Sequence, residues 1–152
     1  MSDGEHGPTE TERVVRSYLE SFSGRDPDAI AAHVSDGFVN DHTAALGEGC
    51  VGRTAYRDRL PAFLADMHEL RYDLEDLIID GDRAAAAYTM HARWRGDRPI
   101  SVRGVQRLRV AQGLITERVD YWDSAGFLLQ AEPGAVDVLA PWGVSAATRP
   151  SG

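Results

Sequence analysis

The sequence predicts an α+β domain in which three helices are followed by an antiparallel sheet. Up to Met67, apolar residues recur at the three- and four-residue spacing of helices, and beyond it they alternate as in strands. Turns that contain glycine divide the second half into strand-sized segments. The 152 residues provide for a single core, and 43% hydrophobic and 26% charged residues are typical of a globular chain. We therefore expect helices packed on one face of a sheet.

Three helix starts can be read from capping residues. Thr9 and Glu12 form a capping box, and the helix that follows is expected to end at Gly24. Asp26 and Pro27 begin a second helix, which Gly37 ends. Thr54 caps a third helix, in which Pro61 should produce a kink. A short strand, 38–40, and a glycine loop, 41–52, lie between the second and third helices.

Four strands follow, at 68–79, 83–95, 99–110 and 114–123, with an irregularity expected near Glu75 in the first. We divide the chain into a disordered tail (1–8), a domain (9–130) and a C-terminal extension (131–152). In that extension Val136, Leu139 and Trp142 are expected to dock against the body or against a partner, because apolar residues in a free tail would serve no purpose.

Composition excludes several function classes. All 16 basic residues are arginine, so chemistry that needs a lysine, such as Schiff-base catalysis, is excluded. The net charge of −8 gives no reason to bind nucleic acid, and no apolar segment is long enough to span a membrane. Cys50 is the single cysteine, so an intrachain disulfide is excluded and a cytoplasmic location is expected. Cys50 as a nucleophile remains an alternative.

The turns also predict which strand residues face the interior. A two-residue turn at Gly96-Asp97 would place His91 opposite Val102, and a three-residue loop at 111–113 would place Gly104 opposite Asp120. One face would then carry Thr89, His91, Val102, Gly104, Gln106, Arg118, Asp120 and Trp122. The other would carry Tyr88, Met90, Trp94, Val105, Val119 and Tyr121. A one-residue slip in either turn would exchange the faces.

Gly104 is the informative position on the first face. A glycine inside a strand often marks the close approach of a ligand. Here it would leave a gap beside Asp120, with His91 on the far side of it. We expect Asp120 to be buried without a partner, so that Asp120→Asn should leave the fold intact.

The order of these elements and several short motifs resemble the nuclear transport factor 2-like superfamily, and within it the SnoaL-like branch. The matching segments span about residues 10–130. They are Asn40-Asp41-His42, Gly52-Arg53, the run 62–66, Asp80-Gly81-Asp82-Arg83, the run 113–117 and Asp120-Tyr121-Trp122-Asp123. The branch includes polyketide ester cyclases, with limonene epoxide hydrolase and ketosteroid isomerase as relatives. The resemblance implies a cone-shaped domain, with a pocket between the helices and a curved antiparallel sheet.

The resemblance also implies functional residues. Asp120 matches the aspartate that serves in acid–base chemistry in the cyclases and the epoxide hydrolase. Gln106 stands where the cyclases have a histidine, and the second acid of the epoxide hydrolase is missing, with Ala87 and Thr89 in that region. Asn40 matches the asparagine before the glycine loop of the hydrolase.

From the residues and the resemblance together, Asp120 and His91 are the candidate catalytic residues. The candidate substrate-binding residues are Asn40, His42, Thr89, Gln106, Arg118, Trp122, Phe63 and Phe127. Each has a structural alternative: a locally bonded Asp120, a satisfied core His91, core aromatic residues, or Arg118 and Gln106 bridging to an acid on a helix. No metal is expected, although His42, His91 and a carboxylate could form a triad.

We therefore expect a cofactor-free enzyme for a small, apolar, oxygenated molecule. Asp120 would remove a proton next to a carbonyl, His91 would stabilise the enolate, and an intramolecular aldol closure of a polyketide-type substrate would follow. An epoxide-opening hydrolase or cyclase and a non-catalytic ligand-binding protein remain alternatives. A homodimer through the outer sheet face is expected, because the apolar residues there would otherwise be exposed.

Overall fold

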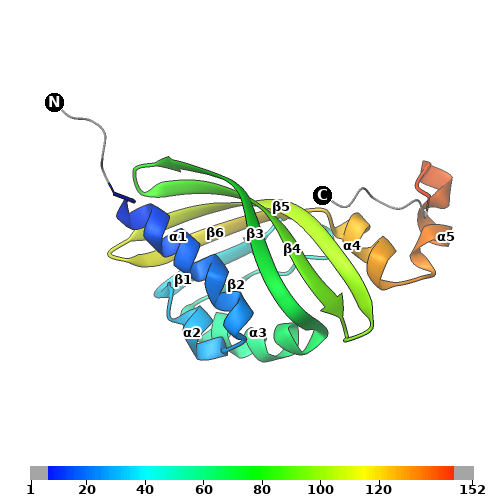
Figure 1. The fold of residues 1–152 in the computed structure, drawn as a ribbon, viewed down its shortest axis with the longest axis horizontal. Helices are drawn as coiled ribbons and strands as arrows, with labels where there is room; N and C mark the ends of the chain where they lie inside the picture. Colours follow the sequence, from blue (N-terminus) through cyan, green and yellow to red (C-terminus); the bar gives the residue numbers. More distant parts are fainter. Residues whose placement is uncertain (1–6, 146–152) are drawn as a thin grey trace.

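The computed structural model describes residues 7–145 as one curved sheet with helices over one of its faces (Figure 1). Helix α1 (Glu10–Ser21) crosses this face and contacts strands β3, β4 and β5. The short η1 (Phe22–Gly24) and α2 (Pro27–Ala31) follow. Helix α3 (Arg53–Asp66) contacts α2, β1 and β3, and closes one end of the same face. The α+β class is therefore confirmed.

The sheet has six strands in the order β2-β1-β6-β5-β4-β3. Their bounds are β1 (Val34–His42), β2 (Cys50–Val51), β3 (Met67–Asp80), β4 (Arg83–Trp94), β5 (Arg98–Ala111) and β6 (Leu114–Trp122). Strand β1 runs parallel to β6 and the other pairs are antiparallel, so the expected antiparallel sheet is in fact mixed. Two helices precede the first strand, and α3 lies between β2 and β3.

Local signals explain where the elements begin and turn. The Thr9 side chain accepts a hydrogen bond from the Glu12 amide at 3.1 Å, and the Asp26 side chain caps α2 in the same way. The register between β3 and β4 shifts between Leu74 and Asp76, where the irregularity was predicted. Pro61 lies inside a helix that continues to Asp66.

The predicted register of the β4–β5 hairpin is wrong by one residue. Trp94 pairs with Arg98 across a three-residue loop, so Tyr88 lies opposite Gly104 and His91 opposite Ser101. Arg95 has a left-handed φ of 52°, and its amide donates to the Asp66 carbonyl of α3 at 2.7 Å. This contact with a helix removes Arg95 from the ladder. As a consequence, Tyr88 and Met90 face the interior and Thr89 and His91 face outward.

The β5–β6 hairpin differs by two residues, which leaves the faces unchanged. Ala111 pairs with Leu114 across a two-residue loop at Gln112-Gly113, and both loop residues have positive φ. The bulge lies instead between Arg109 and Val110. Asp120 therefore lies opposite Gln106, and Trp122 opposite Gly104. Even so, Asp120 and Trp122 keep the inward direction that the sequence predicted.

The core lies between α1, α2, α3 and the inner sheet face. Tyr18, Phe22, Phe38 and Ile30 are among its largest fully buried side chains. The rings of Phe22 and Tyr72 approach to 4.9 Å between centroids. Burial of such aromatic residues holds the helices against the sheet, and Phe22 and Tyr72 also line a cavity on this face.

After β6 the chain forms α4 (Ser124–Ala131), which lies almost entirely within the expected domain, and the C-terminal extension forms α5 (Ala135–Leu139) and η2 (Ala140–Trp142) beyond one end of the sheet (Figure 1). Gln130 of α4 hydrogen-bonds the backbone of Ser101 in β5. Val136 and Leu139 are half-buried, whereas Trp142 is 82% exposed. The expected docking of Trp142 on the body of this chain is therefore wrong. Within residues 7–145, no helix has the length and apolar character that crossing a bilayer requires.

The expected N-terminal tail, residues 1–8, lies mostly outside the described residues, since the structure describes only Gly7 and Pro8 of it. The last residues of the expected extension, 146–152, also lie outside the described part of the chain.

Candidate active site

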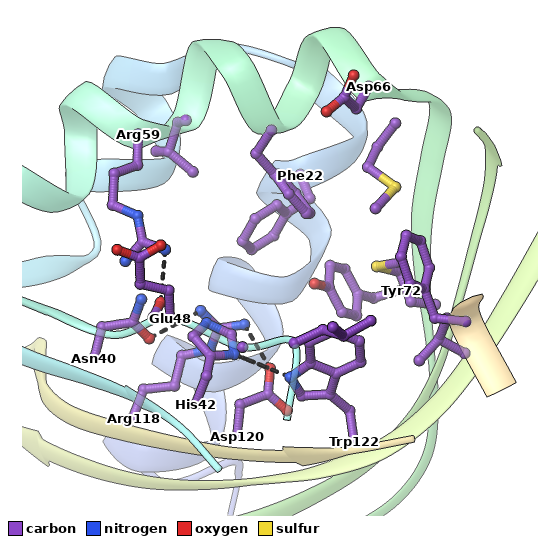
Figure 2. Close-up of a pocket in the computed structure, with 18 of the residues that line it drawn as sticks. Phe22, Asn40, His42, Glu48, Arg59, Asp66, Tyr72, Arg118, Asp120 and Trp122 are labelled. Carbon is purple, nitrogen blue, oxygen red and sulfur yellow. Dashed lines mark hydrogen bonds and ion pairs between the residues drawn. The ribbon is translucent and has the colours of Figure 1, made fainter. Parts of the chain in front are cut away.

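A cavity of about 490 Å³ lies between α3 and the inner face of the sheet. Its volume lies in the range that small-molecule sites occupy. Its walls are mainly apolar and aromatic, and polar side chains gather on the floor formed by β1 and β6 (Figure 2). The apolar lining comprises Phe22, Leu46, Leu60, Ala62, Phe63, Met67, Met90, Val102 and Phe127.

A buried ion pair forms the centre of this floor. Arg118 Nη2 lies 3.0 Å from Asp120 Oδ2, and the two side chains are 5% and 4% exposed. They lie two residues apart on β6, and alternation along a strand sends both to the inner face. Asp120 is therefore buried with a partner, contrary to the expectation of an unpartnered carboxylate.

Gly104 accommodates a side chain of the protein rather than a ligand. Tyr88 lies directly opposite Gly104, and its hydroxyl donates to Asp120 Oδ1 at 2.7 Å. A Cβ atom at position 104 would stand 2.5 Å from this hydroxyl oxygen. Because Gly104 has no side chain, the Tyr88 ring can pass over β5 and reach Asp120 on β6. The predicted gap is real, but Tyr88 fills it.

Burial is the main influence on the Asp120 carboxyl. Burial raises the pKa of Asp120 above its ordinary value, while Arg118 and the hydroxyl of Tyr88 act in the lowering direction. Desolvation is the larger effect. The carboxylate therefore holds a proton more strongly than an exposed aspartate does, and it lines the cavity.

His42 is held as a neutral imidazole. Trp122 Nε1 donates to His42 Nδ1 at 3.1 Å, and an indole nitrogen can only donate. Nδ1 therefore carries no proton, and the ring proton is on Nε2. Burial, with Arg118 and Arg59 nearby, lowers the pKa of His42 to about 3. Although Nδ1 lies 3.9 Å from Asp120 Oδ2, this contact is not an ion pair.

Two buried amides flank the ion pair. Asn40 Oδ1 accepts from Arg118 Nη1 at 3.3 Å, so one arginine holds both Asn40 and Asp120. Gln106 is fully buried and lies across the strands from Asp120. It acts in the direction of lowering the pKa of Asp120, yet neither its Oε1 nor its Nε2 has a hydrogen-bond partner of regular geometry among the described residues. We take Gln106 as a close polar neighbour of the carboxylate.

Tyrosine hydroxyls surround the arginine, and the sequence reading missed them. The Arg118 guanidinium lies 5.7 Å from the centre of the Tyr18 ring, and the hydroxyls of Tyr18 and Tyr56 are hydrogen-bonded to each other. Burial raises the pKa of Tyr18, Tyr56 and Tyr72, so all three keep their protons. The sequence does contain a signal for Tyr18 and Tyr56, because helical spacing places both on the inward faces of their helices.

The other expected site residues divide between two faces. Phe63, Phe127 and Trp122 line the cavity beside Asn40, His42, Arg118 and Asp120. Thr89 and His91 lie on the outer face. There His91 contacts Asp73 and Ser101, each at 3.0 Å, and Thr89 donates to Glu75. The structure therefore separates His91 from Asp120 and does not place His91 at the cavity.

Arg59 was also missed by the sequence reading. It stands on α3 among helical arginines that face solvent, and its spacing gives no sign that it reaches the cavity, which it lines. No group of three or more His, Cys, Asp or Glu side chains suited to a metal ion occurs in the described part of the chain.

Solved structures with the same fold come from several proteins. A protein of Shewanella denitrificans named as a SnoaL-like polyketide cyclase has a TM-score of 0.73 and 16% identity, over 83% of this chain and 99% of its own. An epoxide hydrolase of the limonene type from Mycobacterium tuberculosis has a TM-score of 0.70 and 19% identity, covering 87% and 96%. A protein of Catenulispora acidiphila with a ketosteroid isomerase-like fold, in complex with trimethylamine, has a TM-score of 0.71 and 18% identity, covering 90% and 97%.

No curated protein matches the sequence. The family model of the SnoaL-like domain matches residues 15–118, which is more than half of the chain and extends from α1 into β6. The chain belongs to the SnoaL-like domain family, within the nuclear transport factor 2-like superfamily.

Proposed function

We propose that the protein is a small-molecule enzyme in which Asp120 transfers a proton to and from a carbon next to a carbonyl. The observation that carries this proposal is a buried carboxylate with a raised pKa at the floor of an apolar cavity. Such a group can act as a general base nearer to neutral pH than an exposed aspartate can. Arg118 and Tyr88 hold its two oxygens in place.

His42 is the group we assign to the developing enolate. Because Nδ1 accepts from Trp122, Nε2 carries the proton and has no partner among the described residues. A neutral imidazole can donate a hydrogen bond to a carbonyl oxygen as negative charge grows on it. This replaces the role first expected for His91. The apolar walls would hold a flexible substrate in a folded conformation, which favours ring closure by aldol attack.

Epoxide opening is the second candidate. Arg118 holds Asn40 and Asp120 together, and an amide beside a carboxylate could position a water molecule for attack. No second carboxylate is paired with Asp120 among the described residues, so Tyr88 would be the nearest proton donor. A protein that binds a small ligand without chemistry is the third candidate.

Deuterium exchange tests the first candidate without knowledge of the natural substrate. 2-Tetralone is a small, apolar ketone with acidic hydrogens next to its carbonyl, and NMR in D₂O reports their replacement. We expect the wild-type protein to catalyse exchange and Asp120→Asn to lose about 10²–10⁴-fold in rate. Glu117→Gln removes a carboxylate from the same strand, at a residue that does not line this cavity, and is the matched control.

The outcomes separate the three candidates. Exchange that Asp120→Asn abolishes and Glu117→Gln keeps supports the proposal. Equal exchange by the folded Asp120→Asn variant removes Asp120 from the mechanism. Conversion of an epoxide probe to a diol without any exchange favours the second candidate, and recovery of every probe unchanged favours the third.

We also propose a homodimer through the outer sheet face, in the cytoplasm. Tyr88 and Met90 line the cavity, so the exposed apolar patch is smaller than expected. It includes the cross-strand pair Val105 and Tyr121, which are 38% and 41% exposed, with Arg107 over the Tyr121 ring. Light scattering should give the dimer mass, and Val105→Arg should reduce it to that of the monomer. A monomer mass for the wild type at micromolar concentration contradicts this proposal.

A further inference from the structure

Arg59 extends from α3 into the cavity with half of its guanidinium engaged. Figure 2 shows it descending from the helix toward Glu48, above the floor that carries Asn40, His42 and Arg118. Nη2 donates to the backbone carbonyl oxygen of Glu48 at 2.6 Å. Nη1 is buried and has no hydrogen-bond partner within residues 7–145. Because a guanidinium is planar, fixing one arm also fixes the direction of the other.

The positive charge of Arg59 is not neutralised by an ion pair within the described part of the chain. Arg118 and Asp120 neutralise each other, and Asp66 at the cavity rim is paired with Arg95. The Glu48 side chain is exposed and forms no ion pair with Arg59, which contacts only its backbone. Arg59 is near enough to His42 to help to lower the pKa of that ring. Among the described residues that line the cavity, Arg59 is therefore an arginine without an ion pair, and it lies beside the residues assigned to catalysis.

A buried donor without a partner is costly, and burial is tolerated where a ligand completes the hydrogen bond. We propose that Arg59 is the anchor for a carboxylate carried by the substrate, which binds through Nη1 while its apolar body fills the cavity. The proposal deepens the proposed function, on which it rests, because it assigns a substrate class to the same cavity: a small, apolar oxo acid.

The charge and geometry favour a carboxylate over other anions. A single free arm offers one charge-assisted hydrogen bond, and the rest of the lining is mostly apolar. A phosphate dianion would bring a second negative charge near Asp120 and Glu48, and the described lining offers no second cation without an ion pair to balance it. A neutral carbonyl would leave the charge of Arg59 uncompensated. An anchored carboxylate would also orient the other end of the substrate relative to His42 and Asp120, which lie along the floor in Figure 2.

Binding of two matched probes tests the assignment independently of turnover. 3-Phenylpropionate and 3-phenylpropionamide have nearly the same shape and differ in charge. Titration calorimetry at pH 8, where the acid is ionised, should show about 10–100-fold tighter binding of the carboxylate by wild type, as expected for a hydrogen bond to a charged group.

Variants then show which residue recognises the carboxylate of the probe. Arg59→Gln should lose the preference and bind both probes equally, and Arg59→Lys, which keeps the charge without the fork, should retain part of it. Arg57→Gln is the matched control, because Arg57 lies on the same helix, is paired with Asp28 and does not line the cavity. Glu48→Gln should increase the preference by removing a competing negative charge.

An equal affinity of wild type for the two probes overturns the assignment, and so does a preference that survives in a folded Arg59→Gln variant. The result is distinct from that of the exchange experiment. The wild-type protein reports the two separately, because 2-tetralone has no carboxylate and its exchange does not require an anion anchor. If Arg59→Gln loses the preference for the carboxylate probe, and the wild-type protein does not catalyse exchange into 2-tetralone, the anion site stands and the proposed proton transfer is rejected.

Discussion

Breaking the buried ion pair between Arg118 and Asp120 should destabilise the fold in a way that depends on which partner remains. The perturbation is a set of three variants: Asp120→Asn, Arg118→Met and the double variant. Asp120→Asn leaves a buried cation whose other contacts include the Asn40 amide, Tyr72 and the face of Tyr18. Arg118→Met leaves a carboxylate hydrogen-bonded by Tyr88, with Gln106 as a close polar neighbour and a pKa that burial already raises.

The magnitude follows from the burial of both groups, which are 3.0 Å apart and 5% and 4% exposed. Removing one partner of a buried pair costs about 3–5 kcal/mol. Asp120→Asn should lie near the lower end, because asparagine keeps an oxygen that can accept from the arginine. For a chain of this size, about 3 kcal/mol corresponds to a decrease of about 6–12 °C in Tm. Arg118→Met should cost less at acidic pH, where Asp120 can be protonated.

Urea denaturation of the four proteins gives the coupling energy directly. The double variant contains neither charge, so it should be less destabilised than the sum of the single variants by about 2–3 kcal/mol. Additive effects of the two substitutions would refute the reasoning. So would an Asp120→Asn protein as stable as wild type, which is the result expected from the sequence alone.

Three further predictions concern the neighbours of this pair. Gly104→Ala should destabilise the fold by about 1–3 kcal/mol, measured by urea denaturation, because the new Cβ would clash with the Tyr88 hydroxyl; wild-type stability would refute this. Tyr88→Phe removes a donor that lowers the pKa of Asp120, so the acidic limb of the exchange profile should move to higher pH. An acidic limb at the same pH in Tyr88→Phe and wild type would contradict this prediction. The lowered pKa of His42 contributes stability that is fully present above pH 6.5 and is lost toward about pH 3. The raised pKa of Asp120 acts in the opposite direction, because it favours the fold at acidic pH. His42→Gln should therefore flatten or reverse the loss of unfolding free energy between pH 6.5 and about pH 3. An unchanged loss in that variant would rule out His42 as its cause.

Local signals in the sequence predicted most of the elements. Capping residues identified the starts of α1 and α2, and alternation identified both ends of each strand from β3 to β6 to within one residue. Strand β1 was underestimated, because its pairing with β6 is parallel and long-range, and no nearby turn reports it. The last long strand supplied Asp120 and Trp122 on the inner face as predicted.

The site was harder to predict where tertiary contacts decide the register. The Arg95 amide bonds to Asp66 of α3, and this moves the hairpin by one residue, so Tyr88 takes the inward position expected for Thr89 and His91. Arg59 gave no sequence signal at all, because its direction depends on the backbone of Glu48 in a loop. Neither contact can be predicted from the residues of the turns alone.

In the proposed reaction, the Asp120 carboxyl is the group that exchanges the proton. The most direct measurement follows the carboxyl carbon of Asp120 by ¹³C NMR as the pH is changed, beside the rate of deuterium exchange into 2-tetralone in the same buffers. We expect the carboxyl and the exchange rate to titrate together, at a pKa above that of an exposed aspartate, with exchange lost as the carboxyl is protonated. Exchange that continues at full rate after the Asp120 carboxyl has been protonated would contradict it.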